Sequence, residues 1–175
     1  MIHTQVTLAF ALERGARRSH QIPMYTILLI VHSWLRWVAL VAVIGATFAA
    51  VMGRTQSETD SPADRWALIG VTVLDIQMLI GLVLYLVVSP NMAAIRANFG
   101  EAMRNPQLRF WAVEHITAMM VAVILAHAGR VLARKAKTPR SRRRRLIICF
   151  GIAAVAMILG TPWPGTPAGR PLFRI

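Results

Sequence analysis

Acidic residues are scarce in this chain of 175 residues: 7 aspartates and glutamates stand against 20 lysines and arginines, for a formal charge of +13. Charged residues of both signs together make up only 15% of the sequence, whereas hydrophobic residues make up 56%. The apolar residues also come in long blocks instead of alternating with polar ones. This composition excludes an ordinary soluble domain.

Cysteine is nearly absent as well, since Cys149 is the only one. No disulfide can therefore form within the chain. The sequence also lacks the C-x-x-C-H motif that attaches haem covalently, so that any haem bound here would be a non-covalent, b-type haem.

Four blocks are nearly free of charge and long enough, or almost long enough, to cross a membrane. About 20 residues of helix span the hydrocarbon layer, where every backbone polar group must be satisfied internally. The sequence therefore predicts an all-α fold, an integral membrane four-helix bundle. Its expected spans are residues 24–52, 66–90, 110–133 and 146–161.

Three segments lie outside these spans. Residues 1–23 are interpreted either as a surface helix or as an extension ahead of a true start at Met24. Within the connection formed by residues 91–108, the stretch "AAIRANFGEAMR" could form a short amphipathic helix on the membrane surface. Residues 162–175, rich in proline and glycine, are expected to form an extended tail.

Nine of the twenty cations fall within residues 130–145, the expected connection between the third and fourth spans. A dense basic segment beside membrane helices is typical of the cytoplasmic side, where it meets anionic lipids, and it does not indicate nucleic-acid binding. We therefore expect residues 130–145 to form a cytoplasmic loop of a protein in the bacterial inner membrane. Both termini would then lie outside.

Two histidines are expected at similar depth in different helices. His32 lies about 12 Å beyond Met24, and His115 lies about 9 Å beyond Arg109, at 1.5 Å per helical residue. Both count from the same side of the membrane. Two imidazoles at one level are what a six-coordinate haem iron needs. A membrane histidine can also simply hydrogen-bond a neighbouring helix, and this interpretation remains open.

Other polar residues within the spans need partners, because charge in hydrocarbon is costly. Arg36 is expected to pair with Asp75 across the bundle, with Glu114 as the rival partner. A haem propionate is a third possible partner of Arg36, but Arg109, at the interface, is the better candidate for a propionate because propionates usually point towards the nearer surface. His127 is a secondary candidate that lies near the opposite side; Asp75 could orient it, or it could hydrogen-bond within the bundle.

Four stretches carry a resemblance to a known family: "HSWLRW", "QMLIGLVLYLVVSP", "LRFWAVEHITAMMVAVILAHAGR" and "TPWPGTPAGRPLF". Together they resemble small bacterial four-span membrane proteins labelled cytochrome b. The resemblance begins at Met24 and implies a b-type haem carrier with His32 and His115 at the matching positions. Such relatives often carry a histidine where this chain has Asp75, which argues against a second haem at His127.

The sequence thus supports two hypotheses of different classes. The favoured one is an electron-transfer module that exchanges electrons with a quinone pool or a partner redox complex. The alternative is a structural or accessory subunit of a larger respiratory or photosynthetic complex, without haem. No grouping of nucleophile and base and no HExxH motif is present, so we assign no catalytic residues and expect an electron carrier or subunit instead of an enzyme.

Overall fold

The computed structural model describes residues 2–53 and 61–173, with side chains from Met24 onwards. Every regular element in these ranges is helical. The elements are α1 (Ile2–Met52), α2 (Pro62–Val83), η1 (Leu84–Val88), α3 (Pro90–Ala97), α4 (Phe99–Arg104), α5 (Pro106–Arg109), η2 (Phe110–Glu114), α6 (His115–Arg134) and α7 (Pro139–Leu159). The two η segments are single π-helical turns that continue α2 and precede α6.

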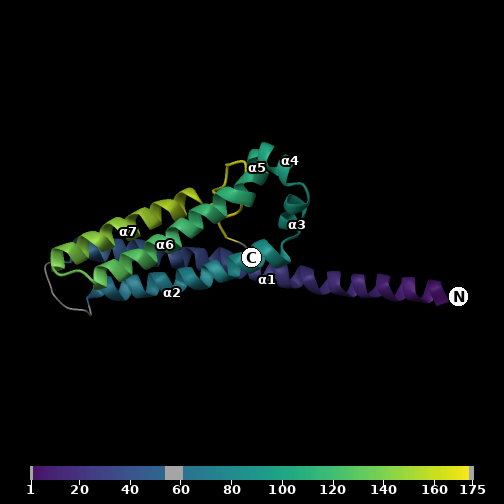
Figure 1. Cartoon of the computed structure of the whole chain (residues 1–175), viewed down its shortest axis with the longest axis horizontal. Coiled ribbons are helices and arrows are strands. Elements are labelled where there is room, and N and C mark those ends of the chain that lie inside the picture. The colour runs from purple at the N-terminus through teal and green to yellow at the C-terminus, as the bar shows by residue number, and fades with distance from the viewer. Residues whose placement is uncertain (1, 54–60, 174–175) are drawn as a thin grey trace.

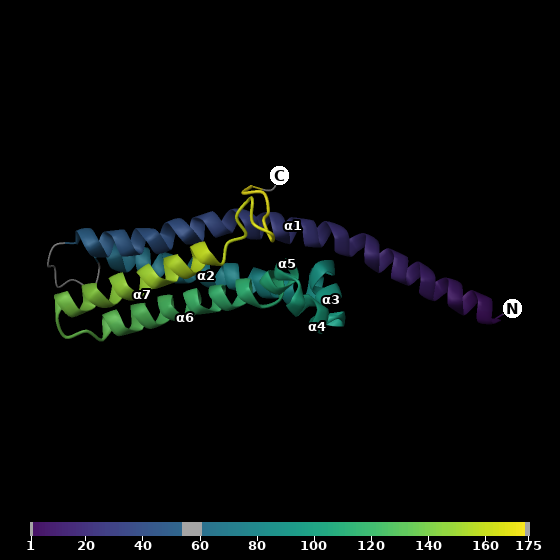
Figure 2. The ribbon, with the colours of Figure 1, turned by 90° about the horizontal axis from the view of Figure 1, so that it is seen from above.

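Four long helices, α1, α2, α6 and α7, lie side by side (Figures 1 and 2). Helix α1 packs against α2 and α7, and α6 packs against α7 and α2. The end of α1, the start of α2 and the α6–α7 connection lie at one end, while α3, α4 and α5 gather at the other. The first part of α1 projects well beyond the other helices.

Most helix starts follow one local pattern, a capping side chain directly before a proline. Ser61, Ser89, Asn105 and Thr138 each accept a backbone N–H from two or three residues further on. A proline at the next position costs nothing, because the first N–H groups of a helix have no internal partner. These four short signals therefore set where α2, α3, α5 and α7 begin.

The interior between the long helices is built largely from small side chains. Ala39, Ala46 and Ala50 of α1 are buried, as are Ala122 and Ala126 of α6. Phe150 of α7 is one of the two largest fully buried side chains. Small residues let helices approach closely. Close van der Waals packing of this kind is what holds helices together in lipid, where the hydrophobic effect does not drive their association.

Three helical stretches are long and apolar enough to cross a membrane: Met24–Met52, Pro62–Val88 and Pro106–Arg134. They correspond to the first three expected spans. The fourth is different, because α7 begins with five arginines within residues 139–145 and only its part from 146 to 159 is apolar. That part is shorter than the roughly 20 residues needed to cross the hydrocarbon unaided.

The prediction of a loop over residues 130–145 is wrong. Helix α6 continues to Arg134 and α7 starts at Pro139, so the connection is only residues 135–138. Arginine is a good helix former, and the Thr138–Pro139 start places the cluster on α7. Several of these arginines hold the helix ends together. Arg142 pairs with Asp64 of α2 at 2.5 Å, and Arg143 and Arg145 donate to the carbonyls of Val51 and Leu132.

The segments outside the spans also differ from expectation. Residues 2–23 are not a separate surface helix but part of α1. The helix expected within residues 91–108 is divided into α3, α4 and α5, because the backbone leaves the helical region at Asn98 and Asn105. The expected extended tail folds through turns back onto α1 in its described part, with the last described residue at Phe173.

Candidate functional site

His32 of α1 and His115 at the start of α6 come together inside the helical packing. Their ring centres are 6.4 Å apart, with the planes inclined at 71°. The sequence placed both at one level from helix lengths alone. An iron bonded to two imidazole nitrogens at about 2.0 Å each, with each nitrogen about 1.1 Å from its ring centre, would separate the centres by roughly 6.2 Å. The observed distance between ring centres is close to that separation, which applies to two rings that each direct one nitrogen towards the iron.

The backbone holds the His115 ring from one side. Its Nδ1 donates to the carbonyl of Gly160 at 2.7 Å, at the point where α7 ends. A histidine that ligates a metal usually donates its other nitrogen in this way, which fixes the tautomer and the ring orientation. With Nδ1 engaged, Nε2 is the nitrogen left for a ligand.

The His32 ring is set by two residues of α2. Gln77 donates its amide to His32 Nε2 at 3.2 Å and to the His32 backbone carbonyl at 3.0 Å. One turn further on, Gly81 leaves room for the ring: a Cβ there would lie 3.1 Å from His32 Cε1. Because Nε2 accepts from Gln77, the neutral ring carries its proton on Nδ1, which is buried and has no hydrogen-bond partner in the described structure. Binding of a metal by His32 would therefore require Nε2 to leave Gln77, or Nδ1 to lose its proton to Nε2.

Both histidines line one cavity with an empty volume of about 1150 Å³, a figure that includes the space at its open mouth. Its walls are mainly apolar and come from α1, α2, η1, α6 and the residues after α7. A smaller cavity of about 420 Å³ lies between α2 and α6 and shares both histidines. Sites for cofactors are typically concave and mainly apolar, with a few convergent polar groups.

The expected pair between Arg36 and Asp75 is wrong. Arg36 Nη2 donates to the carbonyl of Leu172 in the tail at 2.8 Å, and Trp37 Nε1 donates to the same oxygen at 3.1 Å. The tail passes directly along this face of α1. The backbone carbonyl of Leu172 therefore takes the place of the carboxylate that was expected as the partner of Arg36. Arg36 remains at the site because it lines the large cavity.

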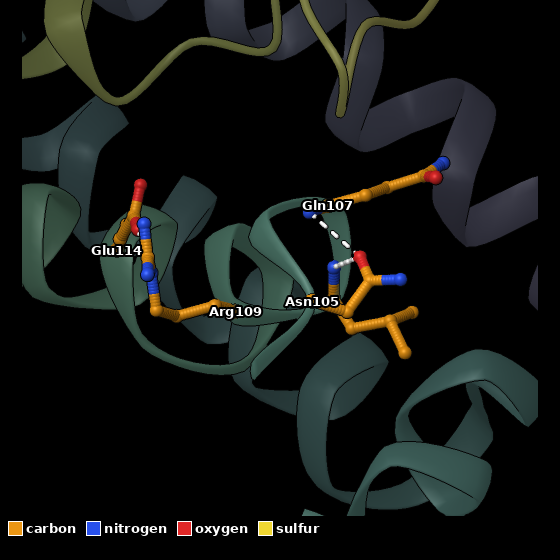
Figure 3. Close-up of polar contacts among 5 residues, drawn as sticks. Asn105, Gln107, Arg109 and Glu114 are labelled. Atoms are coloured by element: carbon orange, nitrogen blue, oxygen red, sulfur yellow. Dashed lines mark hydrogen bonds and ion pairs between the residues drawn. The ribbon is translucent and has the colours of Figure 1, made fainter. Parts of the chain in front are cut away.

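Arg109 and Glu114 bind each other instead of the groups expected for them. Figure 3 shows the Arg109 side chain turned towards Glu114, with Nε and Oε1 2.7 Å apart. Arg109 directly precedes η2 and Glu114 is its last residue, while Asn105 caps α5 by accepting from the backbone N–H groups of Gln107 and Leu108. Neither Arg109 nor Glu114 lines the described cavities.

His127 of α6 binds Asp75 of α2, which is the pairing considered as an alternative from the sequence. Nε2 donates to Oδ1 at 2.8 Å. The side chains are 49% and 48% exposed, and neither residue lines the two cavities. His127 therefore stands apart from the site of His32 and His115.

Several residues of the site were missed from the sequence: Gln77, Gly81, Trp111 and Arg170. Gln77 and Gly81 lie one turn apart within an apolar span, a signal that was available, since a polar side chain and a glycine there each need a reason. Nothing in the local sequence indicated that the tail would bring Arg170 back to the cavity.

No family model, curated protein or solved structure matches the chain. The site must therefore be interpreted from its own geometry.

Proposed function

We propose that the chain is a four-span membrane protein that binds one b-type haem between His32 and His115 and transfers electrons through it. The 6.4 Å separation of the two imidazole rings carries the proposal. The donor set also fits haem, because neutral imidazoles are its common axial ligands and the cavity beside them is apolar.

The membrane arrangement completes the proposal. The apolar part of α7 would cross as the fourth and shortest span, beside α1 and α6. The arginine-rich ends of α6 and α7 would face the cytoplasm and its anionic lipids, with the termini on the outer side of a bacterial inner membrane.

When bound, a bis-imidazole haem supplies one-electron transfer without a change of iron ligands. Neighbouring residues of the chain fix the positions of the two histidine rings. Gly160 orients His115, and Gln77 and Gly81 set the place of the His32 ring. Met119 and Met157 line the cavity and would keep the surroundings of a bound haem apolar, which affects its reduction potential. Electrons would pass to or from a quinone pool or a partner redox complex.

The test is a titration of the purified full chain with ferric haem, followed by reduction. We expect saturation at one haem per chain and a reduced spectrum with a sharp α-band. Protein that contains no haem when isolated from haem-replete cells, and that takes up none in the titration, would contradict the proposal.

One observation favours the second candidate function, an accessory subunit of a larger complex. The half-exposed Asp75–His127 pair lies within two candidate spans. A polar pair that faces lipid is energetically costly, and contact with another subunit would remove this pair from the lipid. Under this function a stable partner co-purifies, and a variant lacking both His32 and His115 still assembles with it.

A further inference from the structure

The large cavity collects buried polar atoms that have no hydrogen-bond partner. Four residues of its described lining each carry one such side-chain atom: His32 Nδ1, Arg36 Nε, Gln77 Oε1 and Trp111 Nε1. Buried polar groups are nearly always paired, so each such atom needs an explanation. Their gathering in a single cavity points to a ligand with polar groups of its own.

Two of these atoms can only donate. They are Nε–H of the Arg36 guanidinium and Nε1–H of the Trp111 indole. A second guanidinium, Arg170, lines the same cavity and lies over the Trp111 ring at 5.3 Å. No acidic residue is present among the described residues of the lining. Two cations and an indole donor therefore share a cavity wall without an anion, an arrangement that is unfavourable until one is bound.

The tail places one of these donors, Arg170, beside the histidines. Helix α7 ends at Leu159, and Thr161, Pro162, Arg170 and Pro171 then line the cavity. The tail is held on α1 through the Leu172 carbonyl, which accepts from Arg36 and Trp37, and through Phe173, which stacks on Trp34. On α1 itself, Arg36 lies one turn beyond His32, about 6 Å along the helix axis.

We propose that Arg36, Trp111 and Arg170 form a carboxylate-binding end of the cavity, which selects a tetrapyrrole with two free carboxylates and fixes its orientation between His32 and His115. This inference rests on the proposed function and names the specificity of that site. Guanidinium groups suit it because they bind carboxylates with paired, charge-assisted hydrogen bonds. The tail is thereby part of the binding site, since it contributes Arg170 and anchors Arg36.

The experiment compares two pigments on the full-length chain purified without haem. One is ferric haem b, and the other is its dimethyl ester, in which both carboxylates are blocked. Wild-type protein should bind haem b at least about tenfold more tightly than the ester, a difference that a direct titration resolves. Arg36→Leu and Arg170→Leu should each weaken haem b binding by about tenfold and leave the ester's affinity nearly unchanged.

Arg109→Leu is the matched control, because Arg109 is bound to Glu114 and lies outside the cavity lining. It should keep the wild-type preference. Arg36→Lys retains the charge but lacks the Nε donor, and it should fall between wild type and Arg36→Leu. It also provides a folded variant if the leucine substitution disturbs the tail.

The outcomes separate this inference from the proposed function. Equal affinity for both pigments in wild type, with a low-spin spectrum retained, would overturn the carboxylate-binding end and leave the haem site standing. A loss of preference in Arg109→Leu alone would move that end to the membrane interface and overturn the assignment. Failure of both pigments to bind would overturn the two together.

Discussion

The His32–His115 and Asp75–His127 pairs both join different helices within the apolar segments, and they differ in what surrounds them. The first pair lines a large cavity, with one imidazole nitrogen held by a backbone carbonyl and another left without a partner. The second is closed on itself by a 2.8 Å hydrogen bond and is about half exposed. The comparison teaches that a histidine in an apolar helix is a candidate for ligand binding when its side chain lines a cavity, and not when a carboxylate already binds it.

Removal of a histidine should have the largest effect, and only in the first pair. His32→Ala or His115→Ala should lower the haem bound per chain by more than about tenfold, because one axial imidazole is lost. The measurement is the ratio of haem to protein after saturation. His127→Ala is the matched control and should bind haem as wild type does. Equal losses in all three variants would erase the distinction between the pairs.

The close approach of α2 to His32 should be the next most sensitive feature. In Gly81→Ala the new Cβ would lie 3.1 Å from His32 Cε1, so the ring must move by a few tenths of an ångström. Overpacking of this kind costs about 1–3 kcal/mol, and we expect haem affinity to fall several-fold to a hundredfold. Gly100→Ala is the control, since a Cβ there meets nothing within 4 Å. A Gly81→Ala variant with wild-type affinity would show that the position of the ring is not critical.

The Asp75–His127 pair should contribute modestly to stability. Interactions of this kind between membrane helices contribute about 0.5–1.5 kcal/mol, and this pair is half exposed. A double-mutant cycle with Asp75→Ala and His127→Ala in detergent should give a coupling energy in that range. A coupling several times larger, or a loss of haem in either variant, would mean that the pair supports the haem site.

The smallest effect sharpens the comparison most. Asp75→His would create a second pair of histidines across α2 and α6, but neither described cavity includes these two positions. We expect the haem-to-protein ratio to remain that of wild type, because two imidazoles without an adjoining cavity leave no space for the porphyrin ring of a second haem. A doubled ratio would show that paired imidazoles are sufficient, and that the cavity is not needed to distinguish the two pairs.

The sequence predicted what depends on local composition and helical spacing. Apolar blocks placed the first three candidate spans, and helix length brought His32 and His115 to one level. Arg36 and the tail show where this reasoning ends. The partner of Arg36 is the carbonyl of Leu172, 136 positions along the chain. A backbone oxygen carries no signature in the sequence, so only the folded path of the tail reveals the contact.

The arginine cluster was misplaced for a related reason. Charge density suggested a loop, whereas the Thr138–Pro139 cap and the helix propensity of arginine start α7 ahead of its apolar part. The contact of Arg142 with Asp64 then ties α7 to α2. Local start signals outweigh composition here.

The central claim, that His32 and His115 act together on one iron, is tested most directly by low-temperature electron paramagnetic resonance of the oxidised, haem-saturated protein. Axial imidazole planes near a right angle leave the iron d orbitals that bind them nearly equal in energy, which makes a low-spin signal strongly anisotropic. The 71° between the two rings therefore predicts such a low-spin ferric signal from bis-imidazole ligation. A high-spin signal, as expected for a haem iron with a single histidine ligand, would contradict the account.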